Sequence, residues 1–314
     1  MILAVAAAVL MSACGSTASG QAQSQAARRP GAATDPAGTS TPVTTVPATT
    51  TTPAPPVPLP GWSAVRTTAT AVTVQRRTIV TANGSTVTLA LFPAGAYRLV
   101  LHAGSSDPPT RGVVLPADGQ SVISAAERPL LVGAFNGGFQ TSTGSGGVEI
   151  GGQVLAALQP GRASVVIDAN GQAKVGVYGQ TVPVPGDPAV SVRQNLGLLV
   201  QGGVVSPGIS NVLSWGATIG GRLAVARSAL GQDAAGDLIV AASMSALPVD
   251  LASALIEVGA TTAMELDINP EWVQLDLASS PGGPLTAAVP GQVRPADQYL
   301  SGWTRDFFTV LATS

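Results

Sequence analysis

The sequence predicts an α+β fold, with a large mixed β-sheet at its core and a few flanking helices. Short runs rich in Val, Leu and Ile recur along the chain, and Gly, Pro, Asn or Asp separates most of them, which is typical of β-strands. Clear helical periodicity is rare by comparison. Apolar residues make up 45% of the chain but aromatic residues only 4%, so the core must be built mainly from aliphatic side chains.

The elements follow from these patterns in chain order. We expect strands at 87–92, 97–102, 130–135, 164–168, 190–192, 198–200, 238–242 and 264–266. The best helix covers 251–258, because its apolar residues recur at i, i+3, i+4 and i+7, and Gly259 follows as a C-terminal cap. A weaker helical pattern covers 120–128.

The first 14 residues predict export. Residues 2–11 form an apolar run that is too short to span a bilayer but suits the core of a signal peptide, although no Lys or Arg precedes it. Small residues then lead to Cys14, a pattern that resembles the lipobox of bacterial lipoproteins. Because Cys14 is the only cysteine, we expect no disulfide and a lipid anchor at this residue, on the extracellular side of the cell membrane. The alternative is a chance cysteine after an ordinary signal peptide, which predicts secretion.

Residues 15–60 predict a disordered stalk, since Thr, Pro, Ala, Ser and Gln dominate them and such a segment cannot bury enough apolar area to fold. We expect one domain over 61–314. The net charge of −2 and the 10% of charged residues argue against a nucleic-acid partner, because no basic stripe is available to neutralise phosphates.

One turn stands out after a buried strand. The apolar run at 130–135 ends at Asn136, and Gly137 and Gly138 follow it in the stretch AFNGGFQ. Paired glycines permit positive φ and let a ligand approach the backbone, although a plain tight turn has the same composition.

Four segments, over about residues 85–275, resemble the phosphodiester glycosidase family in order. They are AFNGGFQ, QNLGLLVQGG from Gln194, ARSALGQDAAGDLIVAAS from Ala226, and LASALIEVGATTAMELDINPEW from Leu251. The resemblance implies an exported hydrolase that cleaves a glycosyl phosphodiester or a related envelope glycan linkage. A non-catalytic protein for glycan binding or exopolysaccharide assembly is the alternative.

The chain departs from the family at one loop. Family members place three glycines and a serine after the aspartate that ends the last strand, whereas here Ile268, Asn269, Pro270 and Glu271 follow Asp267. Because Pro270 has no N–H and Ile268 resists positive φ, we expect an altered binding floor.

The candidate catalytic residues are Glu265 and Asp267. They are two apart on one predicted strand, so their side chains share a face and can act as the acid and base of glycoside cleavage. Glu265 can instead simply pair with an arginine. Asp267 is also the oxygen ligand that a divalent cation would use, and no His/Cys cluster predicts zinc; the sequence implies no other cofactor.

The remaining candidates are binding residues. A half-buried Arg227 needs a structural carboxylate or an anionic ligand, and the resemblance favours the ligand. Asn136 and Asn195, at strand ends, are expected to donate hydrogen bonds to sugar hydroxyls, together with the backbone of Gly137 and Gly138. Trp272 can stack on a sugar or belong to the core. His102, the only histidine, is expected to be structural, because no nucleophile motif accompanies it.

Overall fold

The computed structural model describes residues 56–184, 186, 188–216 and 221–313. The predicted signal peptide, Cys14 and all but the last five residues of the predicted stalk lie outside the described residues. Among those described, no helix is long and apolar enough to cross a membrane.

The described chain folds into three sheets, and every strand pair within them is antiparallel. The prediction of one mixed sheet was therefore wrong. Each expected apolar run overlaps an observed strand, but neighbours in sequence pair as hairpins, for example β13 (Val225–Asp233) and β14 (Leu238–Ala246). Short hairpin connections give antiparallel strands. Strands that are far apart in sequence, such as Thr86–Phe92 and β14, also pair antiparallel.

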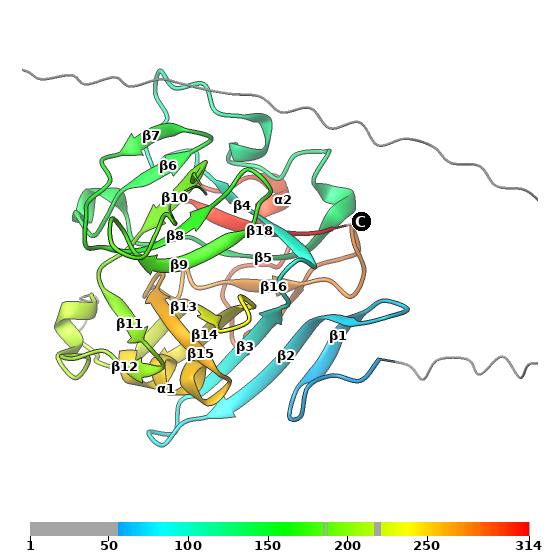
Figure 1. Ribbon diagram of the computed structural model, residues 1–314, viewed down its shortest axis with the longest axis vertical. Helices are drawn as coiled ribbons and strands as arrows, with labels where there is room; N and C mark the ends of the chain where they lie inside the picture. The colour runs from blue at the N-terminus through cyan, green and yellow to red at the C-terminus, as the bar shows by residue number, and fades with distance from the viewer. Residues whose placement is uncertain (1–55, 185, 187, 217–220, 314) are drawn as a thin grey trace, which may run out of the picture. The chain divides into compact units, whose positions relative to one another are not determined.

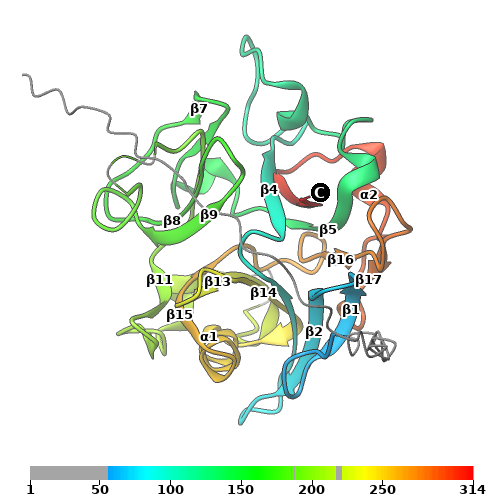
Figure 2. The same ribbon diagram turned by 45° about the vertical axis from the view of Figure 1, so that its right-hand side comes forward.

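Sheet A has eight strands and lies below the other two sheets in Figures 1 and 2, where its strands run beside the helix α1 (Pro248–Glu257). In spatial order it contains β1 (Ser63–Thr67), β2 (Val72–Val80), β3 (Thr86–Phe92), β14 (Leu238–Ala246), β13 (Val225–Asp233), β15 (Ala260–Glu265), β11 (Leu198–Gln201) and β12 (Val204–Val205).

Sheets B and C have five strands each. Sheet B contains β17 (Thr286–Ala287), β16 (Leu275–Leu277), β5 (Leu131–Asn136), β18 (Phe307–Ala312) and β4 (Tyr97–His102). Sheet C contains β7 (Gln153–Ala156), β6 (Val148–Ile150), β10 (Ser191–Gln194), β8 (Ala163–Ile167) and β9 (Ala173–Val177).

The helix expected at 251–258 is present as α1 (Pro248–Glu257), and Gly259 follows it with φ of 95°. Its buried face, which includes Leu251 and Leu255, packs on one face of sheet A. The second helix is the short α2 (Gln298–Ser301). The helix expected at 120–128 does not form; two 3₁₀ turns, Ala117–Gly119 and Arg128–Leu130, flank this stretch instead.

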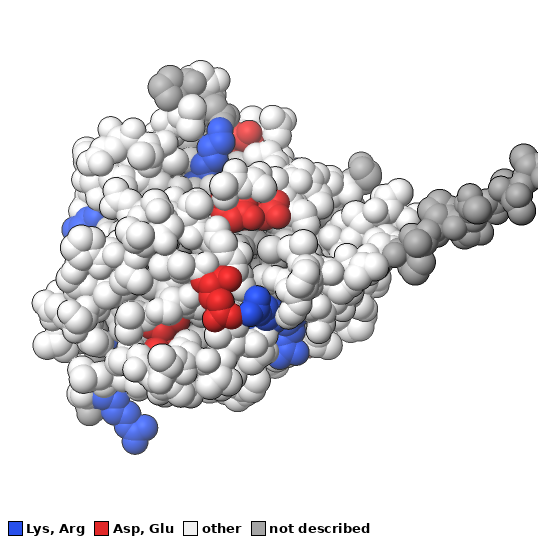
Figure 3. Space-filling view, turned by 60° about the horizontal axis from the view of Figure 1, so that its bottom comes forward, with Lys and Arg blue, Asp and Glu red and all other residues white. Residues whose placement is uncertain are grey.

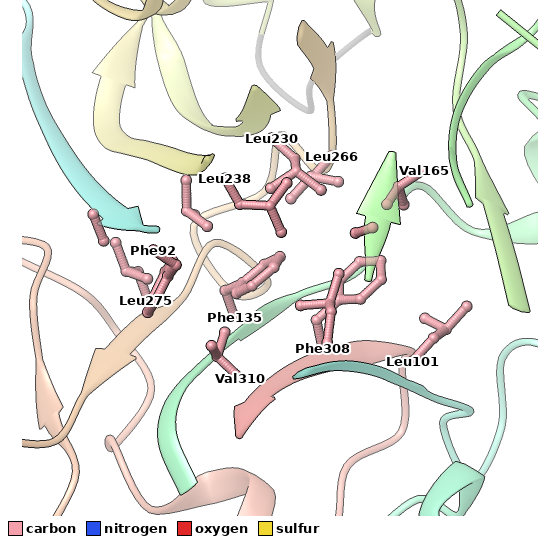
Figure 4. Close-up of a cluster of buried hydrophobic side chains, with 14 of the residues drawn as sticks. Phe92, Leu101, Phe135, Val165, Leu230, Leu238, Leu266, Leu275, Phe308 and Val310 are labelled. Atoms are coloured by element: carbon pink, nitrogen blue, oxygen red, sulfur yellow. The ribbon is translucent and has the colours of Figure 1, made fainter. Parts of the chain in front are cut away.

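The main core lies where the three sheets face one another. Figure 4 shows side chains from all three sheets gathered there, among them Phe92, Leu230, Phe135, Phe308 and Val165. Phe135 and Phe308 stack with their ring centres 5.0 Å apart. Because β5, β13, β15 and β18 all contribute to this core, their ends are held rigidly, and those ends carry the polar side chains described next.

Candidate functional site

Ion pairs and amides connect the sheets at the ends of their strands. Asn136, at the end of β5 in sheet B, donates to Ser228 Oγ of sheet A at 2.9 Å. Asn195, just after β10 of sheet C, donates to the carbonyls of Glu265 and Leu266 at 2.9 and 2.8 Å. The sequence placed both asparagines at strand ends, and the structure brings them into one buried network.

The amide donors of these asparagines are used inside the protein. The second hydrogen bond from Asn136 Nδ2 goes to the carbonyl of Gly137 at 2.8 Å, and its Oδ1 accepts from the Gln274 N–H at 3.1 Å. Both asparagines are at least 97% buried. Their expected role in binding sugar hydroxyls stays a prediction. The hydrogen bonds that these asparagines make in the structure connect the sheets.

Gly137 and Gly138 are required for close packing. Neither has the positive φ that the paired glycines suggested. A Cβ on Gly137 would lie 1.9 Å from Asp306 Oδ2, and one on Gly138 would lie 2.8 Å from Cζ of Arg193. The turn therefore wraps a buried ion pair, in which Arg193 Nε donates to Asp306 Oδ2 at 2.6 Å.

Arg227 and Glu265 form a second buried ion pair. Arg227 Nη1 lies 2.6 Å from Glu265 Oε1, and both side chains are at least 99% buried. The guanidinium also donates to the carbonyls of Trp215 and Ala246. Burial raises the pKa of Glu265, and the Arg227 charge opposes this rise.

This geometry corresponds to the structural alternative for both residues. The donors of Arg227 face a carboxylate and carbonyls of its own chain, and Glu265 has the arginine partner that was the rival to a catalytic role. Glu265 Oε2 and Asn195 Oδ1 are buried without a hydrogen-bond partner among the described residues.

Asp267 differs from Glu265 because it lines a cavity. The cavity has a volume of about 1210 Å³, and Asp267 and the candidate stacking residue Trp272 belong to its wall. The other predicted residues do not line it: Glu265, Arg227, Asn136, Asn195, Gly137 and Gly138. The segment that departs from the family pattern, residues 268–272, forms part of the same wall. Asp267 lies two residues beyond the end of β15, so the strand positions its carboxylate at the cavity.

The environment of Asp267 raises the pKa of its carboxyl group toward neutral pH. Burial raises its pKa to about 7, although the charge of Arg305 and the Ile268 N–H act to lower it. Ile268 N donates to Oδ1 at 2.8 Å, and Arg305 Nη2 donates to Oδ2 at 3.1 Å. A carboxyl group with this pKa can give or accept a proton at physiological pH.

Arg305 is a site residue that the sequence analysis missed. It lines the cavity beside Asp267, and its guanidinium lies 5.1 Å from the ring centre of Trp272. Its Nη2 also donates to the carbonyl of Gly138. Its Nε is buried without a hydrogen-bond acceptor among the described residues, although Asp107 Oδ2 lies 3.5 Å away. The adjacent Arg305-Asp306 pair directly before an apolar strand was the available signal.

Other cavity residues carry charge or an aromatic ring. Trp272 is half-buried in the wall and packs edge-to-face on Trp303, so it contacts both the cavity and the core. Arg162, Arg222 and Glu271 also line the cavity, and Glu271 pairs with Arg294 at 2.6 Å. The wall therefore combines positive groups with the Asp267 carboxyl.

His102 lies in sheet B and lines none of this cavity. Its Nε2 is 3.0 Å from both Thr309 Oγ1 and Glu127 Oε1, its Nδ1 is 2.9 Å from the Gln120 carbonyl, and its ring stacks on Phe307. The nearby Asp107 accepts from the Thr141 hydroxyl at 2.5 Å. The histidine has the contacts expected of a structural residue.

Surface charge and metal ligands are sparse in the described part of the chain. On the face shown in Figure 3, Lys, Arg, Asp and Glu are few and scattered. Among the described residues, no three side chains of His, Cys, Asp or Glu come together as a metal site would require.

Comparisons with known proteins find similar structures at low sequence identity. No family model and no curated protein matches the sequence. The catalytic domain of zebrafish N-acetylglucosamine-1-phosphodiester alpha-N-acetylglucosaminidase, in a form auto-inhibited by its pro-peptide, is 15% identical with a TM-score of 0.48; the match covers 77% of this chain and 82% of that one.

Two further solved structures are similar. A hypothetical protein from Synechocystis is 14% identical with a TM-score of 0.49, and the match covers 76% of this chain and 62% of that one. A protein from Burkholderia pseudomallei described as exported is 14% identical with a TM-score of 0.40, and the match covers 77% of this chain and 75% of that one. Identities and scores at this level leave the function to be argued from the site.

Proposed function

We propose that this protein is a hydrolase that cleaves a glycosyl phosphodiester or a related envelope glycan linkage. The observation that carries the proposal is the Asp267–Arg305 pair in the wall of the large cavity. The order of the four sequence segments that resemble phosphodiester glycosidases supports it.

The pair supplies a proton donor and a positive charge, and a water molecule in the cavity supplies the hydroxyl that bonds to the sugar carbon, releasing its other proton to solvent. A protonated Asp267 can donate a proton to the oxygen that leaves the sugar, and its pKa of about 7 keeps that proton available near neutral pH. Arg305 brings a positive charge to the same place, and this charge can attract an anionic oxygen of the phosphodiester. Trp272 can pack against the apolar face of the sugar ring beside them.

In this proposal Glu265 and Arg227 support the site without touching substrate. Their ion pair and the hydrogen bonds of Asn195 to the Glu265 and Leu266 carbonyls hold the end of β15, which positions Asp267. This differs from the sequence prediction, in which Glu265 was a catalytic partner of Asp267.

Release of free sugar tests the proposal. The purified chain is incubated with the methyl phosphodiesters of several hexoses and N-acetylhexosamines, and reducing sugar is measured over time. The proposal predicts release from at least one of them. Binding of these compounds without release would instead support the alternative of a glycan-binding protein.

We also propose that the chain is exported and lipid-anchored through Cys14. The support is the sequence pattern at residues 1–14 alone. In a bacterial host, Cys14→Ser should move the protein from the membrane fraction to the soluble fraction. An unchanged distribution would contradict the anchor.

A further inference from the structure

A second cavity adjoins the large one. It has a volume of about 330 Å³, at the lower end of the range for small-molecule sites. Ala224, Met244 and Ser245 line both cavities, so the two share a wall. A ligand that fills the large cavity can therefore continue across Ser245 into the second.

The chemistry of the second cavity differs from that of the first. None of its lining residues carries a charge, and half of them offer a hydroxyl or amide group: Asn83, Ser85, Thr86, Ser243 and Ser245. Met244, Val289 and Pro290 supply apolar surface. Hydroxyl and amide groups beside a small apolar surface suit a neutral sugar, whose ring has hydroxyls at its edge and C–H groups on its faces.

A buried carboxylate fixes the polar wall. Asp250, at the start of α1, accepts hydrogen bonds from Thr81, Asn83 and Ser85 in the turn between β2 and β3, at 2.8–2.9 Å. It also accepts the Leu247 N–H at 2.8 Å. Burial acts to raise the pKa of Asp250, but these hydrogen bonds more than offset it and lower the pKa overall. The turn is thus pre-organised, and Ser85 Oγ keeps lone pairs that can accept from a ligand.

We propose that the second cavity is a subsite for a neutral sugar unit, and that the substrate is an oligosaccharide or polysaccharide chain. The inference rests on the proposed function, because it places the reacting linkage at Asp267 and Arg305. The next sugar of the chain crosses Ser245 and occupies the cavity between the β2–β3 turn and β14.

The test compares two substrates and three proteins. One substrate is the methyl diester of a hexose 1-phosphate that the enzyme cleaves, and the other carries three additional neutral hexoses on that sugar. Thr86→Trp fills the second cavity, since Thr86 lines it but does not line the large one. Thr67→Trp is the matched control, because Thr67 is an exposed strand residue that lines neither cavity.

The proposal predicts that the wild-type protein has a kcat/KM at least about tenfold higher for the longer substrate. Thr86→Trp should lose this advantage and keep its kcat/KM for the short substrate, whereas Thr67→Trp should keep both. Equal use of the two substrates by the wild type, or an advantage that survives in Thr86→Trp, would overturn the proposal.

A binding measurement separates this proposal from the hydrolase proposal. If neither substrate releases sugar, the hydrolase proposal fails. Titration with neutral tetrasaccharides (maltotetraose, cellotetraose and mannotetraose) then decides the subsite. Binding of one of them that Thr86→Trp weakens at least about tenfold supports the subsite, while the absence of binding, or equal affinity for both proteins, overturns it.

Discussion

Replacing Gly137 by Ala is expected to destabilise the folded protein, because the new methyl group displaces Asp306. The new Cβ would lie 1.9 Å from Asp306 Oδ2 and 2.7 Å from the Asp306 carbonyl oxygen, far inside van der Waals contact. The carboxylate cannot stay where it is, so its 2.6 Å hydrogen bond from Arg193 and its bond from the Gly138 N–H are lost.

The magnitude follows from the burial of this ion pair. The side chains of Arg193 and Asp306 are both fully buried. Breaking a buried pair and leaving its charges uncompensated costs about 3–5 kcal/mol. For a domain of this size, that loss lowers the melting temperature by roughly 6–20 °C.

Gly197→Ala is the matched control. Gly197 is exposed, lacks a positive φ, and has no neighbouring atom within 4 Å of an added Cβ. The free energy of unfolding of the Gly197→Ala protein should differ from that of the wild type by no more than about 0.5 kcal/mol. Urea unfolding followed by tryptophan fluorescence measures both variants. Equal stabilities of Gly137→Ala and Gly197→Ala would refute the reasoning that the turn is glycine-rich because it encloses Asp306.

Three further outcomes are expected. His102→Gln should lower the free energy of unfolding by about 1–3 kcal/mol, because buried polar partners lose a hydrogen bond, while sugar release by the folded variant stays within about twofold; a complete loss of release would make His102 catalytic. Arg227→Met should lower the free energy of unfolding in urea more at pH 8 than at pH 5. Without its arginine, the buried Glu265 has a raised pKa in the folded state, so the folded state loses stability as the pH rises above the pKa that Glu265 has in the unfolded chain. Adding Glu265→Gln should recover part of the loss at pH 8, and no recovery would contradict a structural role for the pair. The kcat of the wild type should be constant below pH 7 and fall about tenfold per pH unit above it, as Asp267 loses the proton that it donates; a rate that rises through pH 7 would assign Asp267 the role of base.

Local sequence patterns predicted several core strands, but β13 and β18 were not among them, and the run expected at 264–266 covers only the end of β15. The strands expected at 87–92, 97–102 and 130–135 are present as β3, β4 and β5 within one residue. β3 and β5 are rich in buried apolar residues, whereas β4 alternates buried and half-buried residues, and both patterns are typical of strands. The periodicity of Leu251 and Leu255 likewise predicted α1.

Contacts between distant segments were beyond these patterns. Arg193 and Asp306 are 113 residues apart, and nothing in either neighbourhood indicates that β10 and β18 meet. The division into three sheets has the same cause, since strand partners are chosen by packing of the whole core. Arg305 was missed for this reason, as its importance comes from lying beside Asp267 across the fold.

The candidate acids show where residue type alone left the role open. Glu265 ends β15 and Asp267 lies two residues beyond it; both are carboxylic acids, but Arg227 pairs only with Glu265. Arg227 of β13 pairs with Glu265 in the buried interior, and Asp267 is the carboxyl group that lines the cavity. The sequence allowed either a catalytic or a structural role for Glu265. Only the three-dimensional contacts show that Glu265 pairs with an arginine while Asp267 lines the cavity.

Asp267→Asn tests the central claim most directly. The substitution keeps the size of the side chain and removes the proton that the account assigns to the reaction. With a hexose 1-phosphate methyl diester that the wild type cleaves, kcat at pH 6 should fall at least ~10²-fold, and the circular dichroism spectrum should be unchanged. A folded Asp267→Asn protein that releases sugar at the wild-type rate would contradict the account.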